Sequence, residues 1–412
     1  MKYKDRRHTM NLLQEGIDNG TVIKTKQVVK MTVDGITDNY SVFQVRLENL
    51  FYNDQNDRIA TWVSQYKAEH GEESLTRENI ETYNMKIQDF IEKSNPERLK
   101  QTQANIALLG QQKYGVVLND GRIIDGNRRF TCLRNLSKDS DKYHYFETVI
   151  LEKDYEHSAK QIKMLELQIQ IGEEARVDYD PIDRLVGIYR DIEESKLLTV
   201  DEYVRSTGQK KKDVEKDLDV ARLLVEFLEA IKAPKQYYLA REMKLDGPLR
   251  ELFAILKNIK DEDKRQEVKY IVFTNFLMQP QGDMTRFVRK LKGVANSSYI
   301  DEFIEKEMDI TEDILDGLPD NGTVTSDTIA KVRADEEVRE ELEKTMDVVS
   351  NKVKATETRN KPNQMLTKAV DSIEAIDKQI IRKLNEEQRD DLRENIDRLE
   401  ELLDEIKEVL NV

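Results

Sequence analysis

Hydrophobic and polar positions alternate along the first part of the chain. Residues 21–33 read TVIKTKQVVKMTV and residues 40–51 read YSVFQVRLENLF, so β-branched and aromatic residues alternate with polar ones in both. This alternation predicts two β-strands. The DGITDN segment between them predicts a long turn, because Gly, Asp and Asn favour turns. We therefore expect a β-hairpin over residues 21–51.

The apolar spacing becomes helical after a polar loop at residues 53–58. It predicts that residues 59–109 are mostly helical, with a break at Ser94-Asn95-Pro96 and an end at Gly110, since glycine is common just after a helix.

Residues 115–136, GVVLNDGRIIDGNRRFTCLRNL, predict two short strands, a corner and a helix. Asn119-Asp120-Gly121 supplies turn chemistry between the strands. Gly126 permits a sharp exit, so Arg128 and Arg129 are expected at a helix N-terminus, where backbone N–H groups favour an anion. Two guanidinium groups there would add bidentate contacts to phosphate. The alternative is an ordinary corner whose arginines serve packing and solubility.

Helical patterns dominate from about residue 158, after a short strand at Thr148–Leu151. Asp180-Pro181 predicts a helix start. Val200–Ser206, a turn at Thr207-Gly208-Gln209 and Lys210–Phe227 have the spacing of a helix-turn-helix. Its second helix starts with lysines that would meet DNA. An ordinary helical hairpin with a solvated lysine run is the alternative.

The C-terminal part predicts helices joined by two turn-rich linkers, residues 317–329 and residues 360–363. Asn385 and Gln388 have the pattern of a capping box that opens the last helix. The apolar stripe of that helix follows a heptad spacing, which an antiparallel hairpin or a dimerising coiled coil would use. The stripe is Leu392, Ile396, Leu399, Leu403, Ile406 and Leu410.

These elements predict an α+β chain of five parts: a small mixed-sheet domain, a helix-turn-helix domain, a helical domain, a linker with a helix, and an acidic helical hairpin or coiled coil. The expected bounds are residues 1–155, 156–230, 231–315, 316–362 and 363–412.

Composition narrows the class of protein. The chain of 412 residues has one cysteine, Cys132, which excludes a disulfide framework and fits a reducing cytosol. No apolar run approaches the roughly 20 residues that span a bilayer, and the N-terminus lacks the apolar core of a signal peptide. We therefore expect a cytoplasmic protein without a membrane partner.

The net charge of −15 is concentrated in one region. Residues 301–412 contain 32 Asp and Glu against 17 Lys and Arg, whereas residues 1–300 contain 49 of each. A local basic surface for DNA in the first 300 residues is compatible with this distribution, because local charge matters more than the total.

No catalytic motif stands out. The four histidines lack metal-ligand spacing, and neither a Ser-His-Asp nor a Cys-His arrangement is visible. A phosphate-binding loop of the GxxxxGK[ST] form is also absent from the sequence.

The order of the parts resembles the ParB/sulfiredoxin superfamily over residues 40–228, and ParB especially. The resemblance rests on the Asn53…Arg58 loop after a strand, the helix that ends at Gly110, and the corner Gly126-Asn127-Arg128-Arg129, which matches G-x-R-R. It continues with residues 172–176 where the family has E-N-x-x-R, then Asp180-Pro181, and then the helix-turn-helix.

This resemblance implies a DNA-binding protein, gated by CTP or another nucleoside triphosphate with Mg²⁺, in plasmid or phage partition, regulation or defence. Its partners would be double-stranded DNA and a second copy of the chain. It implies nucleotide contacts from Arg58, Gly126, Asn127, Arg128, Arg129 and Arg176, and DNA contacts from Gln209, Lys210, Lys211, Lys212 and Lys216. Glu173 and Glu174 would be the catalytic residues, and Glu173 the metal ligand.

The sequence also departs from the family pattern. Gly172 and Glu173 stand where the family has Glu and Asn, which favours nucleotide binding over hydrolysis. Roughly 40 extra residues precede the Gly110 helix, and residues 230–412 show no match. A relative of ParB from a phage, plasmid or defence locus is therefore expected rather than a chromosome-partition protein.

Two other classes of function stay open. An enzyme on the same fold would be a weak CTPase or other NTPase, or a nuclease; a sulfinic-acid reductase would need a cysteine at the corner, whereas Cys132 lies three residues beyond Arg129. A non-catalytic oligomeric scaffold would instead use the acidic C-terminal helices to bind a protein partner.

Overall fold

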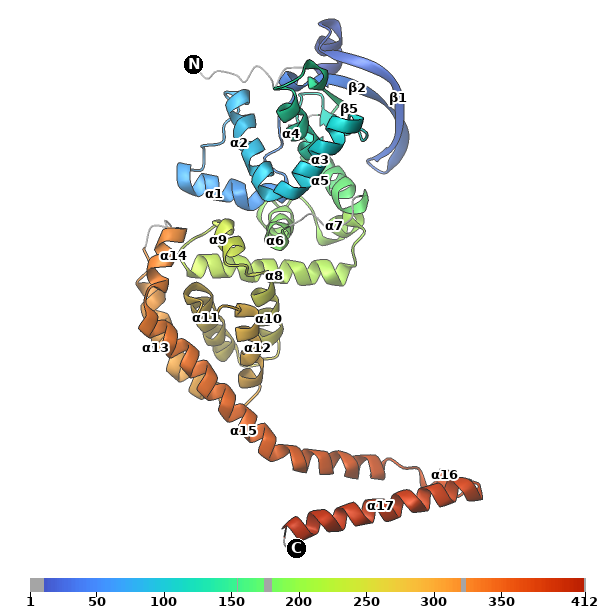
Figure 1. Ribbon diagram of the computed structural model, residues 1–412, viewed down its shortest axis with the longest axis vertical. Coiled ribbons are helices and arrows are strands. Elements are labelled where there is room, and N and C mark those ends of the chain that lie inside the picture. Colours follow the sequence, from blue (N-terminus) through green and yellow to red (C-terminus); the bar gives the residue numbers. More distant parts are fainter. Residues whose placement is uncertain (1–10, 154, 174–179, 320–323, 411–412) are drawn as a thin grey trace. The chain divides into compact units, whose positions relative to one another are not determined.

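The computed structural model describes residues 11–153, 155–173, 180–319 and 324–410. The described chain is mixed α+β, with a five-stranded sheet in its N-terminal part followed by helices (Figure 1). It divides into two compact units, Met1–Ser350 and Asn351–Val412.

The sheet has the strand order β1-β2-β5-β3-β4. β3 and β5 are parallel, and the other neighbouring pairs are antiparallel. The expected strand at Thr148–Leu151 is therefore part of a longer central strand. The strands are β1 (Val22–Val33), β2 (Ile36–Arg46), β3 (Gly115–Leu118), β4 (Ile123–Asp125) and β5 (Tyr145–Leu151).

The predicted hairpin is confirmed, but its long turn is wrong. β1 and β2 are joined by Asp34 and Gly35 alone, whose φ angles of 53° and 77° fit a tight hairpin turn. The ITDN residues that were expected in the turn belong to β2. These four residues of β2 are exposed, whereas Met31 and Val33 at the same end of β1 are buried.

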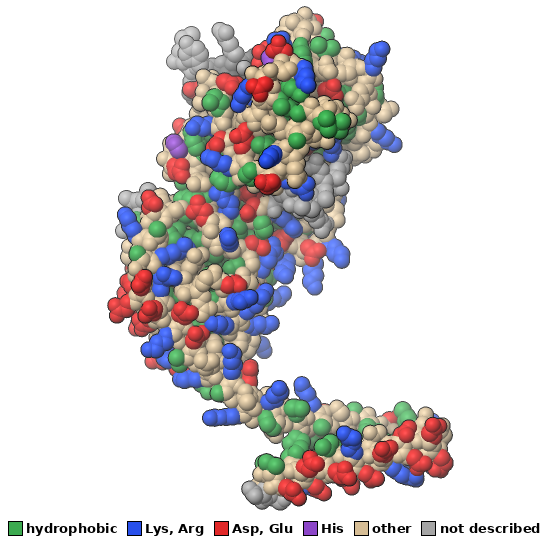
Figure 2. All heavy atoms as spheres, in the orientation of Figure 1, with side chains coloured by type: hydrophobic (Ala, Val, Ile, Leu, Met, Phe, Trp, Pro, Cys, Tyr) green, Lys and Arg blue, Asp and Glu red, His purple; other side chains and the backbone are tan. Residues whose placement is uncertain are grey.

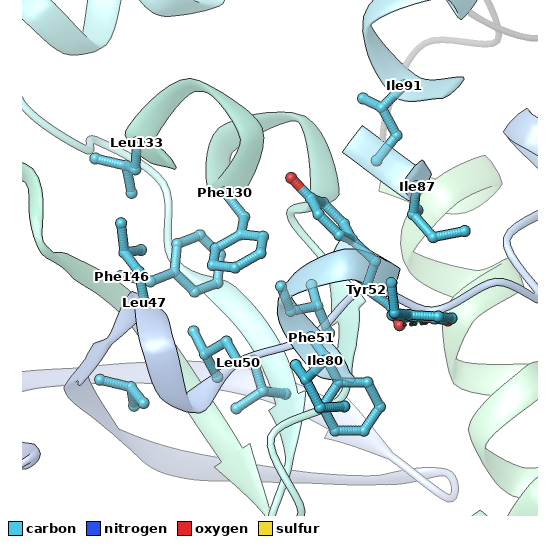
Figure 3. Packing of buried hydrophobic residues seen from close by; sticks show 14 of the residues in the cluster. Leu47, Leu50, Phe51, Tyr52, Ile80, Ile87, Ile91, Phe130, Leu133 and Phe146 are labelled. Carbon is cyan, nitrogen blue, oxygen red and sulfur yellow. Dashed lines mark hydrogen bonds between the residues drawn. The ribbon is translucent and has the colours of Figure 1, made fainter. Parts of the chain in front are cut away.

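Both faces of the sheet are covered, and alternate residues of a strand point to opposite cores. Val117 and Ile150 pack against α1 to α4, in the core shown in Figure 3, whereas Val116 and Val149 pack against α5 on the other face. These helices are α1 (Ala60–His70), α2 (Ile80–Ser94), α3 (Pro96–Leu109), α4 (Asn127–Leu136) and α5 (Tyr155–Leu167).

The helical region between the hairpin and β3 contains one break more than expected. α1 ends at Gly71, because its φ of 97° is incompatible with an α-helix. α2 starts after Asn79, whose side chain caps its N-terminus. The break at Asn95 and the end at Gly110 are confirmed.

Single helical turns connect several of these elements. Three of them lie near the Gly126 corner or the buried cluster beside it: η3 (Asp57–Ile59), η5 (Gln168–Glu173) and η7 (Arg190–Glu194). The others are η1 (Leu12–Gly16), η2 (Leu47–Asn49) and η4 (Asp141–Tyr143).

The rest of the first unit is helical. Asp180 caps α6 as predicted, and the α7–turn–α8 arrangement follows it. The helices are α6 (Pro181–Tyr189), α7 (Val200–Thr207), α8 (Lys211–Ala230), α9 (Tyr237–Glu242), α10 (Asp246–Leu256), α11 (Glu262–Met278), α12 (Met284–Ala295), α13 (Ile300–Asp316) and α14 (Ser326–Arg333).

Both predicted C-terminal linkers need correction. The first overlaps α14, which starts at Ser326 behind a capping Thr325. Residues 360–363 lie inside α15 (Glu336–Glu374), which includes Pro362. Pro362 lacks an N–H group and so removes one backbone hydrogen bond. This loss does not end the helix, because long segments without glycine continue it on both sides of Pro362.

The last helices are α16 (Lys378–Ile381) and α17 (Glu386–Leu410). The capping box that opens α17 is confirmed: the Gln388 N–H donates to Asn385 Oδ1 at 2.8 Å, and the Asn385 N–H donates to Gln388 Oε1 at 3.2 Å. No residue of α17 is buried: Leu392 and Leu399 of its heptad stripe are half-buried, and the other four stripe residues are exposed.

Candidate functional site

The corner before α4 requires a glycine. Gly126 has a φ of 101°, and a Cβ atom there would lie 2.7 Å from Phe146 Cζ. Gly126 is also the N-cap of α4, so no side chain caps the first turn. The N–H groups at the start of α4 are therefore available to an anion.

A cavity of about 200 Å³ opens at this corner. The structure brings together five of the six residues predicted to bind nucleotide: Arg58, Gly126, Asn127, Arg128 and Arg129 all line it. The sixth, Arg176, lies outside the described residues. So do Glu174 and the side chain of Glu173, the predicted catalytic and metal-binding groups.

Sequence reasoning missed several lining residues. Asn56 could have been predicted from the sequence, because Asn in a turn often accepts the N–H two residues further on. Here its Oδ1 accepts the N–H of Arg58. Gln170 lies in η5, far from the corner in the sequence, and no local sequence pattern predicts its place in the cavity. The other missed residues are Ile59, Ile91, Ser94, Thr102 and Asp125.

The described lining of this cavity is cationic, since three arginines face one carboxylate. Arg129 Nη2 donates to Asp125 Oδ2 at 2.7 Å and to the Tyr114 carbonyl at 3.1 Å, which holds Arg129 in place. Asn127 is 8% exposed, and its Oδ1 accepts no hydrogen bond within the described residues. A ligand or water that donates to this oxygen would satisfy it.

A buried ionic cluster lies beside the cavity. The Lys163 ammonium of α5 lies 2.8 Å from Asp57 Oδ2, 3.4 Å from Asp191 Oδ2 and 3.9 Å from Glu166 Oε2. Arg190 of η7 lies 3.4 Å from Asp57 Oδ1. Asp57 precedes Arg58 in the chain, so the cluster anchors the loop that supplies Arg58 to the cavity.

This cluster holds three carboxylates against two cations. Burial raises the pKa of Glu166 and of Asp191 to about 7. Burial alone would lower the pKa of Lys163. The attraction of Asp191, Asp57 and Glu166 for its positive charge is stronger than this effect, so the pKa of Lys163 lies well above its ordinary value. Burial and the neighbouring carboxylates thus favour the protonated forms of Glu166 and Asp191 relative to exposed carboxyl groups.

One hydrogen bond links the cluster to the cavity, since Gln170 Nε2 donates to Glu166 Oε1 at 3.1 Å. The cluster also borders a larger cavity of about 410 Å³, which Lys163, Arg190 and Asp191 line. Charges of both signs line this second cavity.

The predicted helix-turn-helix is present as a local structure. α7 ends at Gly208, whose φ is 64°, and α8 starts two residues after Gln209. Val214 of α8 and Tyr203 of α7 are buried in the same cluster as Leu198 and Leu218.

The predicted DNA-contacting residues divide into two sets. Lys210, Lys212 and Lys216 are exposed, and Lys211 is exposed while pairing with Asp201 at 2.9 Å. Gln209 differs, because it is 8% exposed and its Oε1 accepts from Arg184 Nη2 at 3.1 Å. It therefore stabilises the turn from inside instead of presenting its amide to a ligand.

Cys132 is buried in the core of the sheet domain, where its Sγ donates to the Leu99 carbonyl at 3.6 Å. Burial raises its pKa to about 12, so it is not a reactive thiolate.

Among the described residues, no group of three His, Cys, Asp or Glu side chains could hold a metal ion, and no helix combines the length and apolar character needed to cross a bilayer. Neither the models of known protein families nor the curated proteins contain a match to this sequence.

Proposed function

We propose that this protein is a ParB-like DNA-binding protein whose DNA binding is gated by a nucleoside triphosphate, CTP by resemblance, at the Gly126–Arg129 corner. One observation carries the proposal. Arg58, which is about 70 residues away in the sequence, lines the same cavity as Gly126, Asn127, Arg128 and Arg129 at an uncapped helix start.

The cavity suits the phosphate end of such a ligand. Its volume of about 200 Å³ is below the roughly 300–1,000 Å³ of sites that enclose a whole small molecule. Three arginine forks and helix N–H groups match the charge and geometry of phosphate oxygens. We infer that the base and sugar contact residues beyond this cavity.

The residues around the cavity also fit a bound Mg²⁺ ion in part. Mg²⁺ would neutralise phosphate charge, and the unsatisfied Asn127 Oδ1 could accept from a water that such an ion carries. By resemblance Glu173 would be the metal ligand. Because Gly172 and Glu173 replace the family's Glu and Asn, we propose binding as the role of this site, with hydrolysis by Glu173 or Glu174 as the alternative.

DNA would be bound by the lysines that open α8. The ionic cluster connects the nucleotide cavity to the helix-turn-helix. Asp57, next to Arg58 of the cavity, pairs with Arg190, which lies on the segment that leads into α7. We propose that this contact couples nucleotide binding to DNA binding. We further propose that α17 mediates a homodimer, since four of the six residues of its heptad stripe are exposed.

Isothermal titration with CTP, ATP and GTP in the presence of Mg²⁺ tests the nucleotide site. Saturable binding of one nucleotide is expected, and Arg128→Ala should abolish it. Arg359→Ala, which removes an exposed arginine of α15, is the matched control and should bind normally. Absence of saturable binding for all three nucleotides would overturn the proposed function.

A further inference from the structure

Helix α12 has a one-sided distribution of charge. Its sequence MTRFVRKLKGVA contains four cations and no acidic residue, and its apolar side chains are buried in the first unit. Arg286, Arg289 and Lys292 are exposed and follow a three-residue spacing, which places them on one side of the helix.

This face of α12 is connected to the helix-turn-helix through α10. Arg250 of α10 donates to Asp217 of α8 at 2.7 Å, and Arg289 of α12 donates to Glu251 of α10 at 2.7 Å. Asp217 directly follows Lys216 in α8. Figure 2 shows Lys and Arg side chains along the right edge of the helical region, over the α8 end and over α10 and α12.

Part of this charge has no counter-ion among the residues that the structure describes. Lys212, Lys216 and Lys292 make no ion pair within the described residues. The pairs of Arg286 with Asp283 and of Arg289 with Glu251 are at the surface, where an ion pair contributes little. Exposed cations on α8 and α12, two helices that both pack against α10, suit an extended polyanion better than a small anion.

We propose that the exposed face of α12 (Arg286, Arg289 and Lys292) is a second contact surface for the DNA backbone, continuous with the lysines of α8. The inference rests on the proposed function, since it takes α8 as the primary DNA contact. Contacts from α12 would go to phosphates, so they would position the duplex without reading its sequence.

Salt-dependent binding of a random-sequence DNA duplex to the full chain tests this surface. The triple variant R286Q/R289Q/K292Q is expected to bind about 10- to 100-fold more weakly, with a salt slope lower by about 3, because each phosphate contact adds about one to the slope. The matched control K24Q/K26Q/K30Q changes three exposed lysines of β1 and should bind as the wild type does.

The variant K210Q/K212Q/K216Q separates this inference from the proposed function. If it loses binding while the α12 triple variant keeps the affinity and slope of the wild type, the second surface is overturned and the proposed function stands. If the wild type itself does not bind DNA, both are overturned. If the α12 variant changes only self-association in sedimentation, the face binds an acidic helix of another copy and the inference is wrong.

A single substitution guards against a folding defect in the triple variant. Lys292→Gln breaks no ion pair within the described residues and is expected to lower the salt slope by about one. An unchanged slope for this variant would count against the surface.

Discussion

Asp57 and Lys163 are 106 positions apart in the chain, yet Asp57 Oδ2 accepts a hydrogen bond of 2.8 Å from the buried Lys163 ammonium. This pair ties two parts of the fold together. One is the loop that contains Arg58, and the other is α5, which covers the face of the sheet away from α1 to α4.

Lys163→Met is expected to lower the free energy of unfolding by roughly 3–5 kcal/mol, because it leaves Asp57, Asp191 and Glu166 buried with one cation fewer. Urea unfolding would measure the change. Lys160→Met on the same helix removes a half-exposed pair with Glu202 and should change stability far less, because solvent screens a surface pair. Equal effects of both variants would show that the cluster does not stabilise the fold.

Gly126→Ala is expected to lower stability by roughly 1–3 kcal/mol, since the residue's φ is 101° and the new Cβ would clash with Phe146. The same displacement should weaken nucleotide binding. Gly282→Ala is the control, because nothing lies within 4 Å of its added Cβ. Thermal unfolding and titration with CTP measure the two effects; a Gly126→Ala variant as stable as the wild type would refute the requirement for glycine.

Glu307 is buried between α11 and α13, where its Oε2 accepts from Asn275 Nδ2 at 2.8 Å. Burial raises its pKa from 4.5 to about 8. The folded state therefore keeps a proton that the unfolded state releases, so this residue's contribution to stability falls as the pH rises from about 5 to about 8, by about 1.4 kcal/mol per pH unit.

Glu307→Gln keeps the acceptor for Asn275 and removes the titration. It should flatten the pH dependence of urea unfolding over that range and raise stability at pH 8. Glu305→Gln alters an exposed neighbour on the same helix and should leave the profile unchanged. A wild-type profile that Glu307→Gln does not alter would exclude a protonated Glu307.

Leu399→Asp with Leu403→Asp is expected to abolish self-association, because both leucines belong to the heptad stripe of α17 that we propose as the dimer contact. Sedimentation equilibrium would detect the loss of the dimer. Glu400→Ala with Glu401→Ala changes exposed positions between them and should leave the dimer intact. A wild-type chain that is monomeric at all concentrations would remove this part of the proposal.

The features that could be predicted from the sequence depend on neighbours in the chain. The corner at Gly126, the helix-turn-helix and the α17 cap each need a particular residue at a particular backbone position, so a few letters suffice. The pairing of Asp57 with Lys163 and the burial of Gln209 depend on the tertiary fold, and no local pattern marks them.

The wrong predictions have a common cause. The long turn and the residues 360–363 linker were inferred from polar, turn-favouring letters, but DG alone closes the hairpin and Pro362 lies within a long helix. Turn-forming residues mark where a chain can bend, and flanking pairing decides whether it does.

The burial of Cys132 has a practical use in experiments on this protein. Cys132 is the only cysteine of the chain, and its burial and high pKa protect it from alkylating reagents while the sheet domain is folded. The rate of thiol labelling in the native chain therefore reports the opening of that domain. A cysteine introduced on α12 or α17 would label far faster, which allows site-specific fluorescent probes without removing the native residue.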